Sequence, residues 1–423
     1  MLDRKDLLER RYAVIGQHSP LFYDKPLHLV RGEGVWVEDV DGRRYLDVYN
    51  NVPHVGHCHP HVVDALCKQA ALLNIHTRYL HENIVEYAER LTATLHRDLS
   101  VAMLTCTGSE ANELALRIAR FITGGEGIIV SNFSYHGNTA SLAAATTGLP
   151  APEALGRHVR AVPIPDLLHS DASPETLAQD YAHRVLDAVN SLKEAGIKPA
   201  AILFDTIFST EGLPALPKGY FEQAIAHVRG AGGLFIADEV QPGLGRMGDH
   251  LWGHQAFDFV PDFVTMGKSL GNGHPLAALV TKADYVNAFA ERALYFNTFA
   301  GNPVSSAVGS AVLDVIENEE LMSNANRVGA YLQEKLSHLA QRHDIIASVR
   351  GKGLFFGLEF LNASREPATI ETSRLINLMR DRGVLISKIG PHNNILKMRP
   401  PLQFSLENAD LLLSTLDDAL TKI

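Results

Sequence analysis

Short apolar segments alternate with helical patterns between residues 60 and 281, and this alternation constrains the fold more than any other feature of the chain. The helical patterns cover 60–73, 82–96, 109–122, 175–195 and 219–230, and the apolar segments are Val101–Cys106, Gly127–Ser131, Ala201–Asp205, Leu234–Asp238, Phe263–Met266 and Leu276–Thr281. Strands that alternate with helices form largely parallel sheets covered on both faces. Ligands of such sheets bind at the carboxyl ends of the strands. We therefore predict an α/β domain whose functional site lies where these strands end.

The segments on either side of this region show other patterns. Residues 3–16 have the pattern of an amphipathic helix, and Asp41-Gly42 separates two strand-like runs as in a β-hairpin. After Pro303 a long helical stretch (303–341) precedes a mixture of short strands and helices. The expected strands lie near 344–349, 354–360, 384–388 and 395–398, and the expected helices near 370–382 and 407–421. These patterns predict an N-terminal segment (1–55), a large α/β domain (56–302) and a smaller α+β domain (303–423).

The composition argues against several classes of protein. The 423 residues include 38 Lys and Arg against 48 Asp and Glu, and no basic cluster of the kind that binds nucleic acid is present. No apolar run is long enough to span a membrane, and no apolar signal-peptide region follows the first residues. Three scattered cysteines do not form a disulfide framework. We expect a cytoplasmic protein that binds neither nucleic acid nor membranes.

Three groups of residues follow the predicted strands. Gly108 and Ser109 begin a helix, where free amides suit a phosphate, although an ordinary helix cap explains the same residues. Tyr135 and His136 follow another strand, and the tyrosine ring could lie against a planar ligand or belong to a plain loop. Asp238 ends an apolar strand, where a buried carboxylate needs a partner. A protonated ring nitrogen, an arginine or a metal could be the partner of this carboxylate.

Lys268 follows the strand Phe263–Met266 and precedes two nearby glycines. Burial lowers the pKa of an amine and makes it a nucleophile able to form a Schiff base, whereas most lysines at strand ends are solvated charges. One crossover separates Lys268 from Asp238. An anion site, an aromatic ring, a buried carboxylate and a buried amine together suit pyridoxal phosphate. The histidines between His54 and His61 lack the spacing of a structural zinc site, so we expect no metal.

The sequence resembles the class III aminotransferases, pyridoxal-phosphate enzymes of fold type I, over essentially its whole length. The motifs that carry the resemblance are Gly108-Ser109-Glu110-Ala111-Asn112, Tyr135-His136-Gly137, Asp238-Glu239-Val240-Gln241 with Gly243 to Arg246, Lys268, and Asn297-Thr298-Phe299 with Gly301-Asn302-Pro303. The resemblance implies a large domain with a mostly parallel central sheet. It also implies a smaller α+β domain built from the C-terminal part and an N-terminal segment.

The resemblance implies catalytic roles for Lys268, which would form the Schiff base with the cofactor, and for Asp238, which would pair with the ring nitrogen. Tyr135 would stack on the ring, and Gly108 and Ser109 would hold the phosphate.

Further cofactor contacts are implied for His136, Asp205 and Gln241, with Gln241 near the phenolic oxygen. The family commonly has Glu where Asp205 stands. Thr298 would reach the phosphate of the neighbouring subunit, which implies a homodimer with shared active sites.

The C-terminal motif departs from the pattern of family members that act on α-amino acids. Those members commonly place an arginine three positions before a Pro-Pro pair, and here Lys397 fills that position. Lysine offers a point charge rather than a planar fork, which is less suited to a carboxylate but still suits a phosphate. Arg399 or another arginine could instead bind a carboxylate. The runs 49–60, 77–81 and 271–275 resemble the branch of phospholyases that act on O-phosphoethanolamine and 5-phosphohydroxylysine.

The resemblance thus implies a phospholyase that eliminates phosphate from a small phosphorylated amine, giving an aldehyde, ammonia and phosphate. A class III ω-aminotransferase that moves an amino group to pyruvate or another keto acid is the alternative. The residues expected to contact the substrate are Tyr23, Lys25, Asn51, Arg78, His81, Lys397 and Arg399.

Overall fold

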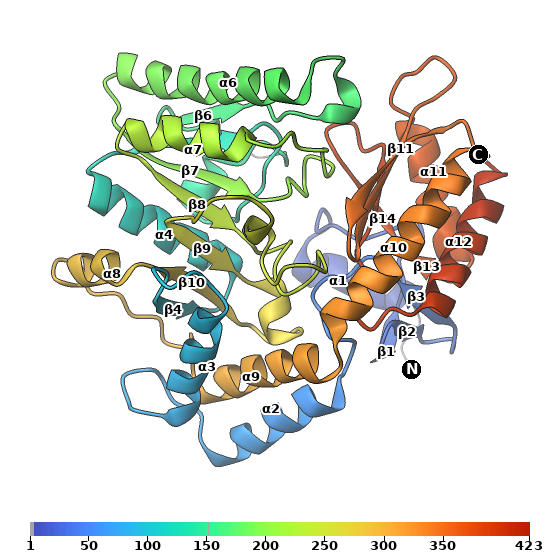
Figure 1. Cartoon of the computed structure of the whole chain (residues 1–423). Coiled ribbons are helices and arrows are strands. Elements are labelled where there is room, and N and C mark those ends of the chain that lie inside the picture. Colours follow the sequence, from blue (N-terminus) through green and yellow to red (C-terminus); the bar gives the residue numbers. More distant parts are fainter. Residues whose placement is uncertain (1–3, 151) are drawn as a thin grey trace.

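A computed structural model describes residues 4–150 and 152–423 of the chain. Its centre is a seven-stranded sheet in the order β4-β10-β9-β8-β7-β5-β6 (Figure 1). The strands are β4 (Val101–Thr105), β5 (Gly127–Ser131), β6 (Val159–Val162), β7 (Pro199–Asp205), β8 (Leu234–Asp238), β9 (Phe263–Met266) and β10 (Ala277–Thr281). In this sheet β10 runs antiparallel to both of its neighbours, β4 and β9, and the other strand pairs are parallel. The predicted, mostly parallel sheet is confirmed, and the edge strand β6 is an addition to the prediction.

Helices cover both faces of this sheet, which explains why its strands read as continuous apolar runs. The helix α4 (Gly108–Thr123) packs on one face, and α6 (Pro174–Glu194) and α7 (Tyr220–Gly230) pack on the other. Along β5, Ile128 and Val130 belong to the cluster that contains α4 residues, whereas Ile129 belongs to the cluster that contains α6 and α7 residues. Alternate side chains therefore enter opposite layers, as the pleat of a strand requires.

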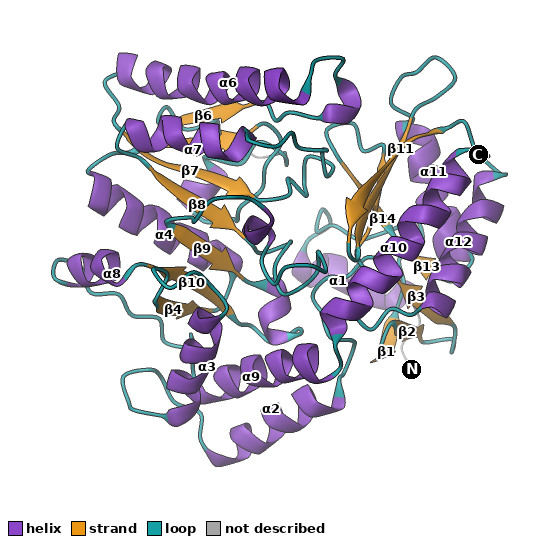
Figure 2. Cartoon of the chain, in the orientation of Figure 1, coloured by secondary structure: helices purple, strands orange, loops and turns teal. Residues whose placement is uncertain are grey.

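A group of helices lies beside the sheet at its β4 end (Figure 2). The helix α9 (Pro303–Asn318) packs against α2 (Pro60–Leu72) and α3 (Glu82–Ala93). The helical stretch predicted over 303–341 consists of two helices, because α9 ends before a second helix, α10 (Leu321–Ala340), begins. Glu320 between them has a φ of 50°, a left-handed conformation that interrupts the helix. Two short helices, α5 (Ala140–Ala143) and α8 (Ala283–Ala290), complete this half.

The second half of the molecule contains two four-stranded sheets. One is ordered β11-β12-β15-β14 and is antiparallel, and the other is ordered β1-β2-β3-β13. The bounds are β1 (Leu29–Glu33), β2 (Trp36–Asp39), β3 (Arg44–Asp47), β11 (Ile346–Lys352), β12 (Phe355–Phe360), β13 (Val384–Leu385), β14 (Ser387–Ile389) and β15 (Ile395–Met398), with helices α11 (Thr369–Asp381) and α12 (Leu406–Leu420). Because β13 pairs in parallel with β3, the C-terminal part and the N-terminal segment share one sheet. This confirms the predicted α+β half, while the predicted domain boundaries stay predictions.

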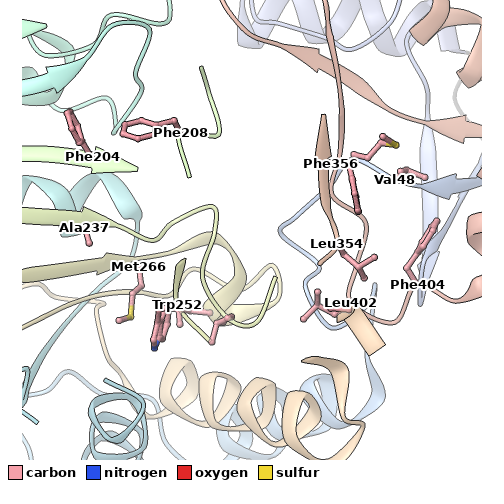
Figure 3. Close-up of a cluster of buried hydrophobic side chains, with 14 of the residues drawn as sticks. Val48, Phe204, Phe208, Ala237, Trp252, Met266, Leu354, Phe356, Leu402 and Phe404 are labelled. Atoms are coloured by element: carbon pink, nitrogen blue, oxygen red, sulfur yellow. The ribbon is translucent and has the colours of Figure 1, made fainter. Parts of the chain in front are cut away.

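One apolar core runs through both halves. Figure 3 shows members of it, with Phe204 and Met266 on strands of the central sheet and Phe356 and Phe404 in the second half. The halves therefore pack against each other through buried side chains.

The first helix, α1 (Arg4–Ile15), matches the pattern predicted over 3–16, of which residue 3 lies outside the described residues. It buries none of its side chains, so the expected apolar face does not pack on this chain. Arg4 connects it to the β2–β3 turn through Asp41, at 2.8 Å. Within the described chain, every helix is too short or too polar to cross a lipid bilayer.

Candidate active site

A cavity of about 210 Å³ lies at the carboxyl ends of β7, β8 and β9. The residues that line it are Gly108, Ser109, Tyr135, His136, Asp205, Asp238, Val240, Gln241 and Lys268. They include every residue predicted to contact the cofactor except Thr298, and Val240 is the one lining residue that was not predicted. A larger cavity, of about 390 Å³, lies between the 206–216 loop and β11, but its lining is mostly apolar and includes none of the predicted residues.

The start of α4 combines a helix cap with free amides that face the cavity. Thr107 is the N-cap: its hydroxyl accepts from the Glu110 amide at 3.1 Å, and the Glu110 carboxylate accepts from the Thr107 amide at 3.0 Å. The amides of Gly108 and Ser109 have no acceptor in the described part of the chain. A Cβ on Gly108 would lie 2.8 Å from a methyl group of Val240, so a larger residue here would require Val240 to move. The helix start is therefore capped by Thr107, and its free amides fit the phosphate of a cofactor.

Asp238, at the end of β8, is 5% exposed and is held by three donors. Its Oδ2 accepts from the His136 ring at 2.7 Å and from the Asn112 amide at 2.9 Å, and its Oδ1 accepts from the Val240 backbone at 3.0 Å. These bonds fix the carboxylate where it lines the cavity, and they leave it able to accept from a cationic ring nitrogen.

Lys268 lies two residues beyond β9, and β9 pairs in parallel with β8. The two strand ends therefore bring Lys268 and Asp238 to the same cavity, as the sequence predicted. The φ of 32° at Lys268 shows that the chain turns sharply at this residue. Burial, together with the nearby charge of Arg399, lowers the pKa of the Lys268 amine to about 8. The amine has no hydrogen-bond or ion-pair partner among the described residues, so it is available as a nucleophile.

Lys397 and Arg399 lie at the end of β15 and share one neutral acceptor, the side-chain oxygen of Gln241. The Lys397 amine donates to it at 3.0 Å, and Arg399 donates to the same oxygen. The Lys397 amine also contacts the Ser209 carbonyl at 3.3 Å, and the Arg399 Nε donates to the Tyr49 carbonyl at 2.8 Å. Within residues 4–150 and 152–423, no carboxylate lies within ion-pair distance of either cation. Burial and the charge of Arg399 hold the pKa of Lys397 well below its ordinary value.

Several residues predicted to contact the substrate have other partners. The Tyr23 hydroxyl donates to the Ile386 carbonyl and accepts from the Ile386 amide, both at 3.1 Å. The His81 ring accepts from the Asn83 amide at 3.2 Å and caps α3. Lys25 is exposed. The Tyr23 hydroxyl and the Nδ1 atom of His81 thus have partners outside the cavity, and the substrate contacts predicted for these two residues stay predictions.

Asn51 is 3% exposed but does not line the cavity. Arg78 lies on the surface, with its guanidinium 3.7 Å above the ring of Phe296. Thr298 is also exposed and does not line this chain's cavity. The loop that carries Thr298 is attached to the first turn of α4 through Asn297, which lies 3.3 Å from the Glu110 carboxylate.

The histidine-rich run pairs with separate carboxylates rather than gathering around one point. His57 lies 2.7 Å from Asp47, and His59 lies 2.8 Å from Glu319. In the part of the chain that the structure describes, no group of three or more His, Cys, Asp or Glu side chains is arranged to hold a metal ion.

Comparison with known proteins identifies the family. The family model "Aminotransferase class-III" matches residues 22–420. An alanine–glyoxylate aminotransferase 2-like protein of Drosophila melanogaster is 39% identical over 100% of this chain and 88% of its own length. An ethanolamine-phosphate phospho-lyase homologue of Caenorhabditis elegans is 35% identical over 99% of this chain and 94% of its own length.

Solved structures show the same relationship. A phospholyase from Arthrobacter, in complex with phosphoethanolamine, is 53% identical, covers 99% of this chain and 100% of its own, and superposes with a TM-score of 0.97. An (S)-enantioselective ω-transaminase from Thermomicrobium roseum is 27% identical over 100% of this chain and 99% of its own, with a TM-score of 0.88. The chain therefore belongs to the class III aminotransferase family of fold-type-I enzymes, whose cofactor is pyridoxal phosphate.

Proposed function

We propose that this enzyme is a phospholyase that eliminates phosphate from a small phosphorylated amine such as O-phosphoethanolamine, giving an aldehyde, ammonia and inorganic phosphate. The observation that carries the proposal is the cation pair of Lys397 and Arg399, which converge on one neutral oxygen of Gln241 beside the cofactor cavity. Buried cations are costly unless an anion offsets them, and a phosphate dianion can accept from both. The 53% identical relative that holds phosphoethanolamine supports the same class of substrate.

The residues of this chain then have distinct tasks. Lys268 would hold the cofactor covalently, give way to the substrate amine, and take the proton from the carbon that bears the nitrogen. Asp238 would hold the ring nitrogen in its protonated form, and Tyr135 would lie against the ring. Pyridoxal phosphate supplies the electron sink that makes this carbon acidic.

The phosphate leaves from the adjacent carbon. Lys397 and Arg399 would bind its oxygens as the carbon–oxygen bond breaks, so that both bonding electrons depart with the phosphate. Loss of phosphate leaves an enamine, which Lys268 would release by taking back the cofactor. The free enamine takes up a proton on carbon to become an imine, and water hydrolyses the imine to an aldehyde and ammonia. In a transaminase the proton would instead return to the cofactor, and the nitrogen would remain on it.

The alternative function is that of an ω-aminotransferase that uses pyruvate or another keto acid. The observation that favours it is Arg399, whose planar guanidinium can bind a carboxylate through two parallel bonds. The aminotransferases among the relatives are compatible with this activity. Lys397 distinguishes the alternatives, because a point charge at that position suits phosphate better than carboxylate.

We also propose that the enzyme is a homodimer with shared active sites. Two apolar residues close to Thr298 in the sequence are exposed, Leu294 at 92% and Phe299 at 73%, and Leu80 on another loop is fully exposed. The helix α1 buries no side chain on its own chain. Contiguous exposed apolar surface marks contact sites, and we infer that these side chains belong to one. A second copy would cover it and would receive Thr298 at its phosphate site.

The test of the reaction is phosphate release from O-phosphoethanolamine by the holoenzyme without any keto acid. The proposal expects phosphate and acetaldehyde in equal amounts, and it expects Lys268→Ala to release neither. Absence of phosphate release, together with alanine formation from pyruvate and a simple amine, would establish the aminotransferase instead.

A further inference from the structure

A buried asparagine, Asn112, connects three segments beneath the cofactor cavity. Its side chain, on α4, is fully buried. The amide nitrogen donates to Oδ2 of Asp238 on β8 at 2.9 Å and to the backbone carbonyl of His136 at 2.8 Å. The amide oxygen accepts from the hydroxyl of Thr265 on β9 at 2.6 Å. Both N–H groups and the oxygen of Asn112 are therefore occupied.

The orientation of this amide follows from its partners. The His136 carbonyl can only accept, and so can the ionised Asp238 carboxylate, so the amide nitrogen must face them. The Thr265 hydroxyl then donates to the amide oxygen on the other side. Rotation of the amide by 180° would place its oxygen beside the His136 carbonyl and the Asp238 carboxylate and break the two bonds that the amide nitrogen donates. Thr265 adds a third bond, to the amide oxygen, in the observed orientation.

The arrangement restrains the rotation of the Asp238 carboxylate. Asn112 and His136 both donate to Oδ2, while Oδ1 accepts from the Val240 amide. The neighbouring strand end carries a second buried carboxylate, Asp205, which is paired in register with Asp238. Like charges this close repel, and the three donors to Asp238 offset that repulsion. Since Asn112 also binds the His136 carbonyl, it sets the place of the histidine that shares Oδ2.

We propose that Asn112, itself locked by Thr265, is a positioning residue that sets how strongly Asp238 holds the ring nitrogen of pyridoxal phosphate. The inference rests on the pairing of Asp238 with the ring nitrogen, which is part of the proposed function. It is independent of whether the reaction is elimination or transamination. Asn112 touches neither the substrate nor the reacting atoms, and its effect reaches the cofactor through Asp238.

The experiment compares the binding of two ligands to the apoenzyme. One is pyridoxal phosphate, and the other is its analogue in which a CH group replaces the ring nitrogen. Equilibrium dialysis gives the dissociation constant of each. Asn112→Leu keeps the approximate volume and removes the donors, and a lost bond to a charged group weakens binding by about tenfold or more. We expect this loss for pyridoxal phosphate and no comparable loss for the analogue, which offers no ring nitrogen to Asp238.

Thr265 supplies a second pair of variants in case Asn112→Leu does not fold. Thr265→Val keeps the branched shape and removes the hydroxyl that locks the amide, so it should weaken pyridoxal phosphate selectively. Thr265→Ser keeps the hydroxyl and should restore wild-type binding. Leu116→Ala is the matched control, because Leu116 is fully buried on the same helix and has no polar side-chain atom. It should change the two dissociation constants by the same factor.

Asp238→Ala distinguishes a failure of the pairing between Asp238 and the ring nitrogen from a failure of the positioning role of Asn112. If it weakens both ligands equally, the pairing of Asp238 with the ring nitrogen is wrong. If it is selective for pyridoxal phosphate while Asn112→Leu and Thr265→Val are not, the pairing stands and the positioning role of Asn112 is overturned. Selective loss in all three variants, with recovery in Thr265→Ser, is the expected result.

Discussion

Asp205 and Asp238 are register partners at the ends of the parallel strands β7 and β8, so two buried carboxylates lie side by side at the floor of the cofactor cavity. Burial, followed by the charge of Asp238, raises the pKa of Asp205 to about 6. The hydroxyl of Ser209 and the amide of Ile207 donate to Asp205 and offset part of this effect. A cationic ring beside the pair would relieve the repulsion, which links this geometry to the binding of the cofactor.

The apoenzyme should therefore lose stability as the pH rises past the ordinary range of a carboxyl. The folded-state pKa of Asp205 lies above the ordinary value of a carboxyl. Asp205 thus binds more protons in the folded form between about pH 4 and 6, and its contribution to the free energy of unfolding falls across that window by roughly 3 kcal/mol. Asp205→Asn should remove this contribution, while that of Glu211, whose pKa is raised by burial to about 8, remains. Denaturant midpoints of the two apoenzymes at pH 4.5 and 7.5 test it, with the exposed Asp258→Asn as the control. An unchanged pH dependence in Asp205→Asn would contradict the prediction.

Replacing Lys397 by methionine should impair the use of phosphorylated substrates in particular. Lys397→Met keeps the length of the side chain and removes its charge, and one charged hydrogen bond accounts for a rise in KM of about 10- to 100-fold. Steady-state kinetics with O-phosphoethanolamine measure this rise. Lys388→Met is a matched control, because Lys388 lies on the neighbouring strand β14 and contacts Ser373 instead. Equal effects of the two substitutions would count against a phosphate site at Lys397.

The affinity for O-phosphoethanolamine should also fall as the pH rises. Burial and Arg399 depress the pKa of Lys397, so the free enzyme loses its charge at that position at lower pH than an ordinary lysine would. A bound phosphate dianion favours the charged amine, and binding at higher pH must therefore take up a proton. The pH profile of KM tests this, and the same profile of Lys397→Met should be flatter. A wild-type KM that improves steadily with pH would show that the charge of Lys397 is not involved.

Covalent attachment of the cofactor should depend on the pH through Lys268. Its pKa of about 8 means that the neutral, nucleophilic amine becomes the main form above that pH. The attachment rate after addition of pyridoxal phosphate to the apoenzyme should rise through pH 8 and level off. Stopped-flow absorbance measures the rate, and borohydride reduction followed by peptide mapping locates the modified lysine. Lys268→Ala should bind the cofactor without any reducible link, and modification of another lysine in that variant would mean that the assignment is wrong.

Mixed dimers can show whether Thr298 acts on the neighbouring subunit. Subunits that carry Lys268→Ala pair with subunits that carry Thr298→Glu. Each homodimer alone should be nearly inactive, the first because it lacks the lysine that binds the cofactor and the second because its glutamate repels a phosphate. If Thr298 acts across the dimer, the mixed dimer contains one site with both wild-type residues, and activity returns to about half per dimer. No recovery would place Thr298 at its own subunit's site. The same design with Arg78→Glu tests Arg78, which stacks on Phe296 near Thr298.

The strand ends could be predicted from the sequence because the signal there is local. An apolar run that ends at Asp238, or just before Lys268, already shows where a buried strand stops, and parallel strands bring such ends to one edge of the sheet. The contacts of Lys397 and Arg399 with Gln241 could not be predicted in this way. They join distant parts of the chain, and they depend on side-chain directions that no periodicity encodes.

Three further features could not be predicted from the sequence. The break between α9 and α10 occurs at Glu320. Glutamate is an ordinary helix residue, unlike glycine or proline, so the helical pattern of the sequence shows no interruption there. Tyr23 is predicted to contact the substrate, and its hydroxyl bonds to the backbone of Ile386, a residue far along the chain. Asn112 was part of a recognised motif, but its role depends on Thr265 and Asp238, which lie on other strands.

The parallel pairing of β3 with β13 has a consequence for protein synthesis. The hairpin of β2 and β3 leaves the ribosome early, but the edge of β3 gains its partner only when Val384 and Leu385 have been made. Until then the hairpin has an unpaired edge, while the seven strands of the central sheet can already assemble. The half of the enzyme that carries Lys397 and Arg399 therefore completes last, so a nascent chain acquires its cofactor-binding strands before the cations that we assign to the phosphate.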